Sequence, residues 1–525
     1  MRRVRLLVTC AATAASFELA ALGGLGALEG CGSSDGNASA VGADAATIEA
    51  APPEGGSVEA SSPDATSPHP PPRPIYTRDY GSTSSIDAGG PVTIVPTGML
   101  VDPSGGVFLA GSYAGGPVDV GDHALPTPQG GDAFLLQLDG AGGHVQSKVL
   151  GDGALQTGGE VAGSATKLYA SVVFAGTVTF EGGQQITSLG NGASPNSVAA
   201  RFGPQLAFGD SYGFTGPAPL RVTHLAPGAS DTAVVFGDWI NMLRTGAAPN
   251  VARNPLHPGL VVARIFGGVG SADIVHTDYC PDGTSCIGSA LATSSAGDAL
   301  LGGRFLGTLA GVAGGADLTA TGDDDAYLLK LDSMLVPQWQ LSFGGAGIQE
   351  VTAIASVPKT SDFVVAGVFH GSFTPPGQVP IQATDAGSDL FVARVDGKGS
   401  VVWAKTFGGG GDDVVRGITV DADANVFLVG DFHGPNLTFG GDVLVNADNQ
   451  GRGTRDVFLA WLDGAGNHVY SGAFGSPGDE SPIGVGLDGM GNIVVAGSFD
   501  QGIDFGGGLV RAVGATDMFV TRLAR

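Results

Sequence analysis

Five acidic residues have the types and spacing that could support ligand chemistry. They fall in the segments that join one repeated unit of the chain to the next, and they are Glu350, Asp412, Asp413, Asp479 and Glu480. If these segments share one face of the fold, the carboxylates form an acidic rim that could bind Ca²⁺ or a basic partner. The alternative is that each carboxylate accepts backbone N–H groups of its own turn. We predict no cofactor and no dedicated metal site, and we leave Ca²⁺ at the rim open.

Two cysteines, Cys280 and Cys286, form a second candidate pair. The five residues between them, Pro-Asp-Gly-Thr-Ser, predict a tight, exposed turn in a loop that links two units. In an oxidising compartment such a pair forms a disulfide. A metal site would need two more ligands, and His276 and Asp278 are the nearby candidates. We predict the disulfide.

Other chemically capable residues have simpler interpretations. His370 and His433 recur at one repeat position, where we expect exposed histidines at strand ends rather than a shared ligand site. Asp421 begins a stretch that lacks the Gly and the distant Glu of a calcium loop, so it predicts a hairpin turn. The repeats contain no His-Glu-x-x-His and no phosphate-binding loop, and we predict no catalytic residue.

A repeat of about 64 residues must position these candidates. Residues 97–113, 416–432 and 483–499 each read as an apolar strand, a turn of Asp, Gly or Asn, and a second apolar strand that ends in an aromatic residue. That aromatic recurs every 61 to 67 residues, at Tyr113, Phe174, Trp239, Phe305, Phe369, Phe432 and Phe499.

A second hairpin follows in each unit. Its first strand carries Phe134, Val198, Val261, Tyr327, Phe391, Phe458 and Phe519. Its second strand ends at Leu150, Tyr212, Tyr279, Phe343, Phe407 and Phe474. Each unit therefore predicts a four-stranded antiparallel sheet. Such sheets bury both faces when they stack radially around an axis, so the sequence predicts an all-β propeller.

The two ends of the repeated region determine the number of blades. The last unit, residues 483–525, has three strands, and Pro74 to Gly81 has the pattern of a fourth strand without a partner nearby in sequence. We expect the N-terminal strand to complete the last blade. This predicts a closed, seven-bladed, monomeric propeller over residues 75–525.

The repeat carries three motifs in succession. They are Asp-x-Phe-x-x-x-Leu-Asp-x-x-Gly, then Trp-x-x-x-Phe-Gly-Gly-x-Gly-x-Asp, then Val-Asp-x-x-Gly-Asn-Val, with the best copy from Asp389 to Phe432. This pattern resembles the bacterial β-propeller repeat of the SBBP type, over roughly residues 75–525. The resemblance implies an exported or cell-surface protein of undefined function, with no catalytic residues tied to the repeat.

The N-terminus predicts export. Residues 1–30 combine a basic start with an apolar stretch, and the tetrad Leu-Glu-Gly-Cys ends at Cys31. This resembles a bacterial lipoprotein signal peptide, which implies that Cys31 is acylated and becomes the first residue. No Asp follows Cys31 directly, as in lipoproteins passed to the outer membrane. A cleaved secretory signal and a retained anchor are the alternatives.

Composition sets the remaining expectations. Residues 31–74 are rich in Ala, Ser, Pro and Gly and predict a disordered tether. A formal charge of −26 repels nucleic acid and anionic lipid, so the membrane contact would be the lipid anchor alone. We predict a non-catalytic cell-envelope lipoprotein whose propeller binds a protein or glycan ligand. A propeller hydrolase or lyase acting on an extracellular polymer is the alternative.

Overall fold

The structure is a computed structural model. It describes residues 70–82, 92–151, 154–164, 166–188, 195–215, 220–228, 232–239, 242–245, 251–252, 259–265, 272–273, 280, 284–448 and 453–525, all in one compact unit. Over these residues the fold is all-β. Helical structure there is confined to two three-residue 3-10 turns, η1 (Glu181–Gly183) and η2 (Pro204–Leu206).

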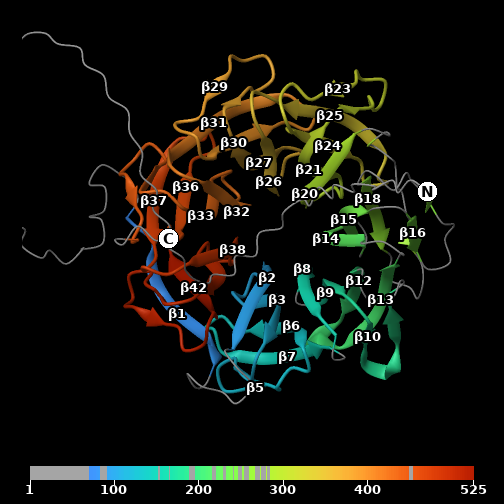
Figure 1. Ribbon diagram of the computed structural model, residues 1–525, viewed down its shortest axis with the longest axis vertical. Helices are drawn as coiled ribbons and strands as arrows, with labels where there is room; N and C mark the ends of the chain where they lie inside the picture. Colours follow the sequence, from blue (N-terminus) through green and yellow to red (C-terminus); the bar gives the residue numbers. More distant parts are fainter. Residues whose placement is uncertain are drawn as a thin grey trace, which may run out of the picture. The chain divides into compact units, whose positions relative to one another are not determined.

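Seven antiparallel four-stranded sheets surround one axis as the blades of a β-propeller, and their innermost strands lie around the centre of Figure 1. The strands of each blade are given from the axis outward. Blade 1 consists of β2 (Thr93–Val101), β3 (Val107–Ala114), β6 (Gly131–Leu138) and β7 (His144–Leu150). Blade 2 consists of β8 (Gln156–Ser164), β9 (Lys167–Phe174), β12 (Asn196–Phe202) and β13 (Phe208–Thr215), and blade 3 of β14 (Leu220–Pro227), β15 (Ala233–Trp239), β18 (Gly259–Ile265) and β19 (Ala272–Asp273).

Blades 4 to 7 follow the same plan. Blade 4 consists of β20 (Ser285–Thr293), β21 (Ala299–Leu306), β24 (Asp325–Leu331) and β25 (Pro337–Phe343), and blade 5 of β26 (Gln349–Ser356), β27 (Phe363–Phe369), β30 (Asp389–Val395) and β31 (Val401–Gly410). Blade 6 consists of β32 (Asp413–Val420), β33 (Val426–Phe432), β36 (Asp456–Leu462) and β37 (His468–Phe474). Blade 7 consists of β38 (Glu480–Leu487), β39 (Ile493–Phe499), β42 (Asp517–Ala524) and β1 (Arg73–Ser82).

Strands from opposite ends of the chain close the ring. β1 pairs antiparallel with β42, from Arg73 opposite Ala524 to Tyr80 opposite Met518. The two strands lie side by side in Figure 1, one blue and one red. This confirms that the N-terminal strand completes the last blade, and the strand begins at Arg73, one residue before the predicted Pro74.

The apolar core lies between the blades rather than within one of them. Side chains of a strand alternate between its two faces, so both faces of a blade can be apolar. In β33, Val426 and Leu428 pack toward blade 5, whereas Phe427 and Val429 pack toward blade 7. The described residues form seven such clusters, one at each junction of adjacent blades. An isolated blade would expose these faces, so the ring is the unit of stability.

Each blade also carries a short hairpin between its second and third strands, a feature that we did not predict. The hairpins are β4 (Val118–Asp119) with β5 (Ala124–Leu125), β10 (Thr177–Thr179) with β11 (Gln185–Thr187), β16 (Met242–Thr245) with β17 (Val251–Ala252), β22 (Thr308–Leu309) with β23 (Leu318–Thr319), β28 (Ser372–Phe373) with β29 (Ile381–Gln382), β34 (Asn436–Thr438) with β35 (Leu444–Val445), and β40 (Gly502–Ile503) with β41 (Val510–Arg511).

These hairpins lie at the periphery of the ring, as the labels β5, β10, β23 and β29 show in Figure 1. Strands β4, β16 and β34 pair with the fourth strand of the preceding blade, namely β1, β13 and β31. An outer strand without a partner exposes N–H and C=O groups to other chains. The hairpins therefore cover part of the outer edge of three blades.

The two faces of the ring carry different connections. Because the strands of a blade are antiparallel, the hairpins and the blade-to-blade links share one face, which we call the link face. The tight turns lie on the opposite face, where Asp421 accepts the backbone N–H groups of Asp423 and Asn425 at 2.9 and 2.8 Å. Asp421 is thus a turn residue, as predicted, and Asp463 makes the same contacts to Ala465 and Asn467.

One predicted register position was wrong. The aromatic that ends the fourth strand of blade 2 is Phe214, not Tyr212. Phe214 lies opposite Ser197 in the ladder, as Phe343 lies opposite Ala326 in blade 4. The two aromatics are only two residues apart on the same side of the strand, so spacing alone did not separate them. The corresponding residue predicted for blade 3, Tyr279, lies outside the described residues.

Candidate functional site

A buried side chain begins most of the innermost strands, at the junction with the preceding blade. This position lies opposite the aromatic that ends the second strand, as Asp413 lies opposite Phe432. Its fully buried occupants, with relative exposures of 0%, are Ile94, Gln156, Cys286, Gln349, Asp413 and Glu480. The backbone N–H at this position donates to the preceding blade, for example from Glu480 to the Arg455 carbonyl at 3.0 Å.

The preceding blade supplies a buried Asp at the start of its third strand. In blade 5 this is Asp389, whose carboxylate accepts the backbone N–H and the hydroxyl of Thr384 at 2.8 and 2.9 Å. The carboxylate lies over Gly408, where a Cβ would come within 2.2 Å of Oδ1. This close approach explains why Gly follows the terminal aromatic Phe407. Burial raises the pKa of Asp389.

Two consecutive junctions therefore bury carboxyl groups from both blades. We call these the acid junctions, Asp389 with Asp413 between blades 5 and 6, and Asp456 with Glu480 between blades 6 and 7. Burial, followed by the charge of Asp389, raises the pKa of Asp413 to about 8. Burial also raises the pKa of Glu480 to about 9 and that of Asp456 to about 7. These pKa values favour the protonated forms of Asp413 and Glu480 at neutral pH.

Equivalent positions at two other junctions hold an amide instead of a second acid. Gln156 begins the innermost strand of the blade that comes after the blade of Asp132. Gln349 begins the innermost strand of the blade that comes after the blade of Asp325. The Gln349 Nε2 donates to the Ser372 carbonyl at 2.8 Å. A protonated carboxyl group also has one donor and one acceptor oxygen, so it is the closest chemical equivalent of the amide. Asp413 and Glu480 thus occupy the position that these amides hold at the other two junctions, and burial raises the pKa of both carboxyl groups.

The other members of the predicted acidic rim are held by local partners. Glu350 accepts from the Ser289 hydroxyl, and its Oε2 lies 3.4 Å from Nε of Arg304. Asp412 accepts the Ser388 N–H at 3.0 Å. These contacts tie one blade to the next, because Ser289 and Arg304 belong to blade 4 and Glu350 to blade 5.

Asp479 likewise accepts a backbone N–H, from Arg455 at 3.1 Å. The structure thus places two of the five predicted carboxyls, Asp413 and Glu480, in the interior, where they cannot contribute to a solvent-facing rim. The reason is positional: the first residue of an innermost strand points into the blade junction, whereas the residue before it lies in the link. Asp412 and Asp479 remain in the links and accept backbone N–H groups of the preceding blade, whereas Glu350, which we placed in a link, is the second residue of β26 and pairs with Arg304.

The two predicted histidines each lie beside a polar group of a neighbouring loop. His370 Nε2 lies 3.9 Å from Asp412 Oδ1, and His433 Nε2 contacts the Gly453 carbonyl. Over the part of the chain that the structure describes, no three His, Cys, Asp or Glu side chains are grouped so as to hold a metal ion.

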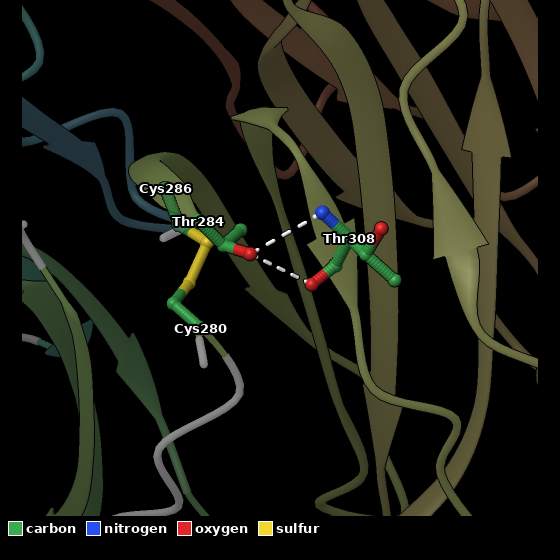
Figure 2. The surroundings of a disulfide bond; sticks show 4 residues. All are labelled: Cys280, Thr284, Cys286 and Thr308. Atoms are coloured by element: carbon green, nitrogen blue, oxygen red, sulfur yellow. Dashed lines mark hydrogen bonds between the residues drawn. A yellow bond between two sulfur atoms is a disulfide. The ribbon is translucent and has the colours of Figure 1, made fainter. Parts of the chain in front are cut away.

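Cys280 and Cys286 lie within disulfide range, with a Cα–Cα distance of 6.2 Å, and the structure joins their sulfur atoms (Figure 2). Both cysteine side chains are fully buried, and Thr284, in the turn that we expected to be exposed, is buried as well. The reason is that Cys286 occupies the same junction position as Asp413. Beside it, the Thr284 hydroxyl donates to the Thr308 carbonyl at 2.8 Å and accepts the Thr308 N–H at 3.2 Å (Figure 2).

A surface cavity of about 310 Å³ lies on blade 4, between β25 and the connection from β22 to β23. Its lining includes Val312, Leu318, Gln338, Trp339 and Gln340. Sequence reasoning missed this cavity, because its two walls are some 20 residues apart and the unpredicted hairpin supplies one of them. The one available signal was Trp339, a large aromatic in an outer strand.

Cys31 lies outside the described residues. Within them, no helix has the length and apolar character needed to span a bilayer. No protein-family model matches the chain, and neither does any curated protein. The resemblance of the repeat to the SBBP type stays a prediction, and function is inferred from the fold and the geometry above.

Proposed function

We propose that this protein is a cell-envelope lipoprotein whose propeller is a non-catalytic binding scaffold. A propeller fold supports a binding or scaffold role in general. The observation that carries the finer proposal is the set of seven peripheral hairpins, one per blade, on a frame whose junctions repeat. Rigid frames that present variable loops are a common basis for binding. The ligand would be a protein or a glycan met outside the cytoplasm.

The repeated frame supports this role through its rigidity. Seven interblade cores and the β1–β42 ladder hold the hairpins in fixed positions, so little conformational entropy is lost when a ligand binds. The lipid on Cys31 and the tether 31–74 would place the propeller at a membrane surface, in the outer membrane of a diderm cell. The charge of −26 disfavours nucleic acid as the ligand.

The full chain, tested on arrays of glycans and envelope proteins, checks this proposal. Variants with single hairpin tips replaced by Gly-Ser should lose a specific ligand while their melting temperature stays close to that of the parent. A ligand whose binding survives replacement of every tip would contradict the role of the hairpins. Turnover of a glycoside or ester that one carboxylate substitution abolishes would favour the alternative, a propeller hydrolase or lyase.

A further inference from the structure

A cation recurs at one position of the third strand, where it pairs with an acid in the first turn of the same blade. In blade 4, Lys330 is the sixth residue of β24, and its Nζ lies 3.0 Å from Asp298 Oδ2. In blade 5, Arg394 is the sixth residue of β30, and its Nη2 lies 2.7 Å from Asp362 Oδ2. In these blades the cation therefore fixes a turn of its own blade.

Blades 6 and 7 have first turns of the same construction. Asp421 Oδ2 accepts from Asn425 Nδ2 at 2.8 Å in blade 6, and Asp488 Oδ2 accepts from Asn492 Nδ2 at 2.7 Å in blade 7. In blade 7 the cation comes again from the sixth residue of the third strand, Arg522, which contacts Asp488.

Blade 6 takes its cation from the neighbouring blade instead. The sixth residue of β36 is Trp461, so the third strand supplies no cation there. Arg525 follows directly after β42 of blade 7, and its Nη1 lies 2.6 Å from Asp421 Oδ2. The side chains of Arg525 and Asp421 are 26% and 11% exposed, so solvent screens this pair less than an ion pair on an open surface.

The guanidinium of Arg525 also lies on the aromatic core between blades 6 and 7. Its Cζ is 4.3 Å from the centre of the Trp461 ring and 5.2 Å from that of Phe427. These two rings are stacked on each other and fully buried. A cation is attracted to the face of an aromatic ring, more strongly where water is displaced. One side chain thus combines an ion pair and a cation–π contact across the junction.

Arg525 lies where blade 7 lacks a turn that other blades have. In blades 5 and 6 a turn joins the third strand to the fourth, and the preceding blade donates to it. Trp339 Nε1 donates to the Gly397 carbonyl and Trp403 Nε1 to the Gly464 carbonyl, both at 3.0 Å. Blade 7 has no such turn, because β42 and β1 come from opposite ends of the chain. Arg525 therefore makes the contact to blade 6 at the end of the ladder where the turn is missing.

A second arginine of the same segment holds the other side of blade 7. Arg522 Nη1 donates to the Gly140 carbonyl of blade 1 at 2.7 Å. Arg522 and Arg525 thus connect blade 7 to both of its neighbours, on the face opposite the link face.

We propose that Arg525 is a clasp that holds blade 7 against blade 6 and so limits opening of the ring. Its release uncovers the Trp461 ring and leaves the adjacent end of the β1–β42 ladder without support. β1 then separates from β42 from the pair of Arg73 and Ala524 onward. The clasp acts whether or not the propeller binds a ligand, so it is independent of the proposed function.

The test is hydrogen exchange of the full chain, followed by mass spectrometry of peptides from β1, β42 and β30. Arg525→Ala should speed exchange in β1 and β42 by roughly tenfold, because local opening becomes more frequent. Arg525→Lys keeps the charge without the planar guanidinium and should give an intermediate rate. Arg394→Ala is the matched control. It removes an ion pair within blade 5 and should leave β1 and β42 within about twofold of the parent.

A second pair of variants tests the partner of the clasp. Trp461→Arg gives blade 6 the cation that blade 7 has, so in this background Arg525→Ala should change exchange in β42 by less than about twofold. If Trp461→Arg does not fold, Asp421→Asn replaces it, because the amide removes the charge and keeps an acceptor oxygen for the turn. Arg525→Ala should then have a clearly smaller effect than in the parent.

The clasp is wrong if Arg525→Ala leaves exchange in β1 and β42 unchanged, or speeds it equally in β30. It is also wrong if Arg394→Ala speeds exchange in β1 and β42 as much as Arg525→Ala does. An effect of Arg525→Ala that stays the same in the Trp461→Arg and Asp421→Asn backgrounds would show that Arg525 does not act through Asp421.

Discussion

The side-chain hydroxyls of Thr77 and Thr521 lie 3.0 Å apart, although 444 residues separate them in the chain. Thr521 also donates to the Tyr76 carbonyl at 3.0 Å. These contacts lie in the middle of the β1–β42 ladder, which pairs strands from opposite ends of the sequence. The closure of the ring therefore depends on this ladder.

Deleting residues 75–81 should destabilise the protein far more than deleting residues 60–66 from the predicted tether. The first deletion removes most of β1 and leaves β42 as an open edge. It also removes Tyr80, which is 2% exposed and packs in the cluster between blades 7 and 1. Thermal unfolding of the two truncations measures the difference.

A pair of point variants refines this test. Tyr80→Ala should lower the free energy of unfolding by about 3–5 kcal/mol, as expected for a large buried aromatic. Ile75→Ala, at a position that is 51% exposed on the same strand, should cost much less. If both deletions melt at one temperature, or both point variants do, β1 does not hold the ring closed.

The acid junctions predict a stability that falls as pH rises. The pKa of Glu480 is raised from about 4.5 to about 9, chiefly by burial, so the folded protein keeps a proton that the unfolded chain releases between these values. The contribution of this proton to stability is complete below about pH 4.5 and is lost as the pH rises to about 9. The slope for one such group is at most about 1.4 kcal/mol per pH unit.

Glu480→Gln should flatten this pH dependence, because the amide cannot ionise and already occupies the equivalent position at Gln349. Urea unfolding at pH 5, 7 and 9 gives the comparison, and at pH 9 we expect the variant to be more stable by on the order of 2–3 kcal/mol. Gln349→Glu is the reverse control. It places a second carboxyl beside the blade of Asp325, whose own pKa burial raises, and should steepen the decline. Unchanged slopes in both variants would mean that the acid junctions do not titrate with folding.

The buried cysteines predict a protein without reactive thiols at positions 280 and 286. Alkylation under denaturing conditions without reductant, followed by peptide mass spectrometry, should leave both residues unmodified. Replacing both by Ala should cost about 2 kcal/mol on the chain-entropy model for so short a loop. Two alkyl groups on these residues before reduction would refute the bridge.

Lipidation is the prediction on which the proposed location depends. Cys31 follows a basic segment and an apolar stretch, whereas Cys10 has too little apolar sequence before it. Palmitate labelling in a bacterial host should disappear in Cys31→Ala and persist in Cys10→Ala. Label retained by Cys31→Ala would show that the anchor, if there is one, is elsewhere.

The sequence by itself determined the architecture of the ring. Strand alternation and terminal aromatics such as Phe432 and Phe499 are local patterns, and their recurrence counts blades without any knowledge of the tertiary fold. The strand from Pro74 to Tyr80 could also be predicted from the sequence, because the N-terminal end of the repeated region has an extra fourth strand and the C-terminal unit lacks one.

Only the tertiary structure decided what the polar residues do. Asp412 and Asp413 are neighbours in sequence, yet one accepts a backbone N–H in a link and the other is fully buried, because burial depends on which side of the innermost strand faces the next blade. A polar residue recurs in the sequence just before an apolar strand, and this recurrence marked the position. Its partner belongs to the preceding blade, so the sequence alone did not show how the residue is used. The cavity beside Trp339 could not be predicted from the sequence, because a pocket forms where separate segments of the chain converge. In addition, strands β22 and β23 have two residues each, which is too short for a periodic pattern in the sequence.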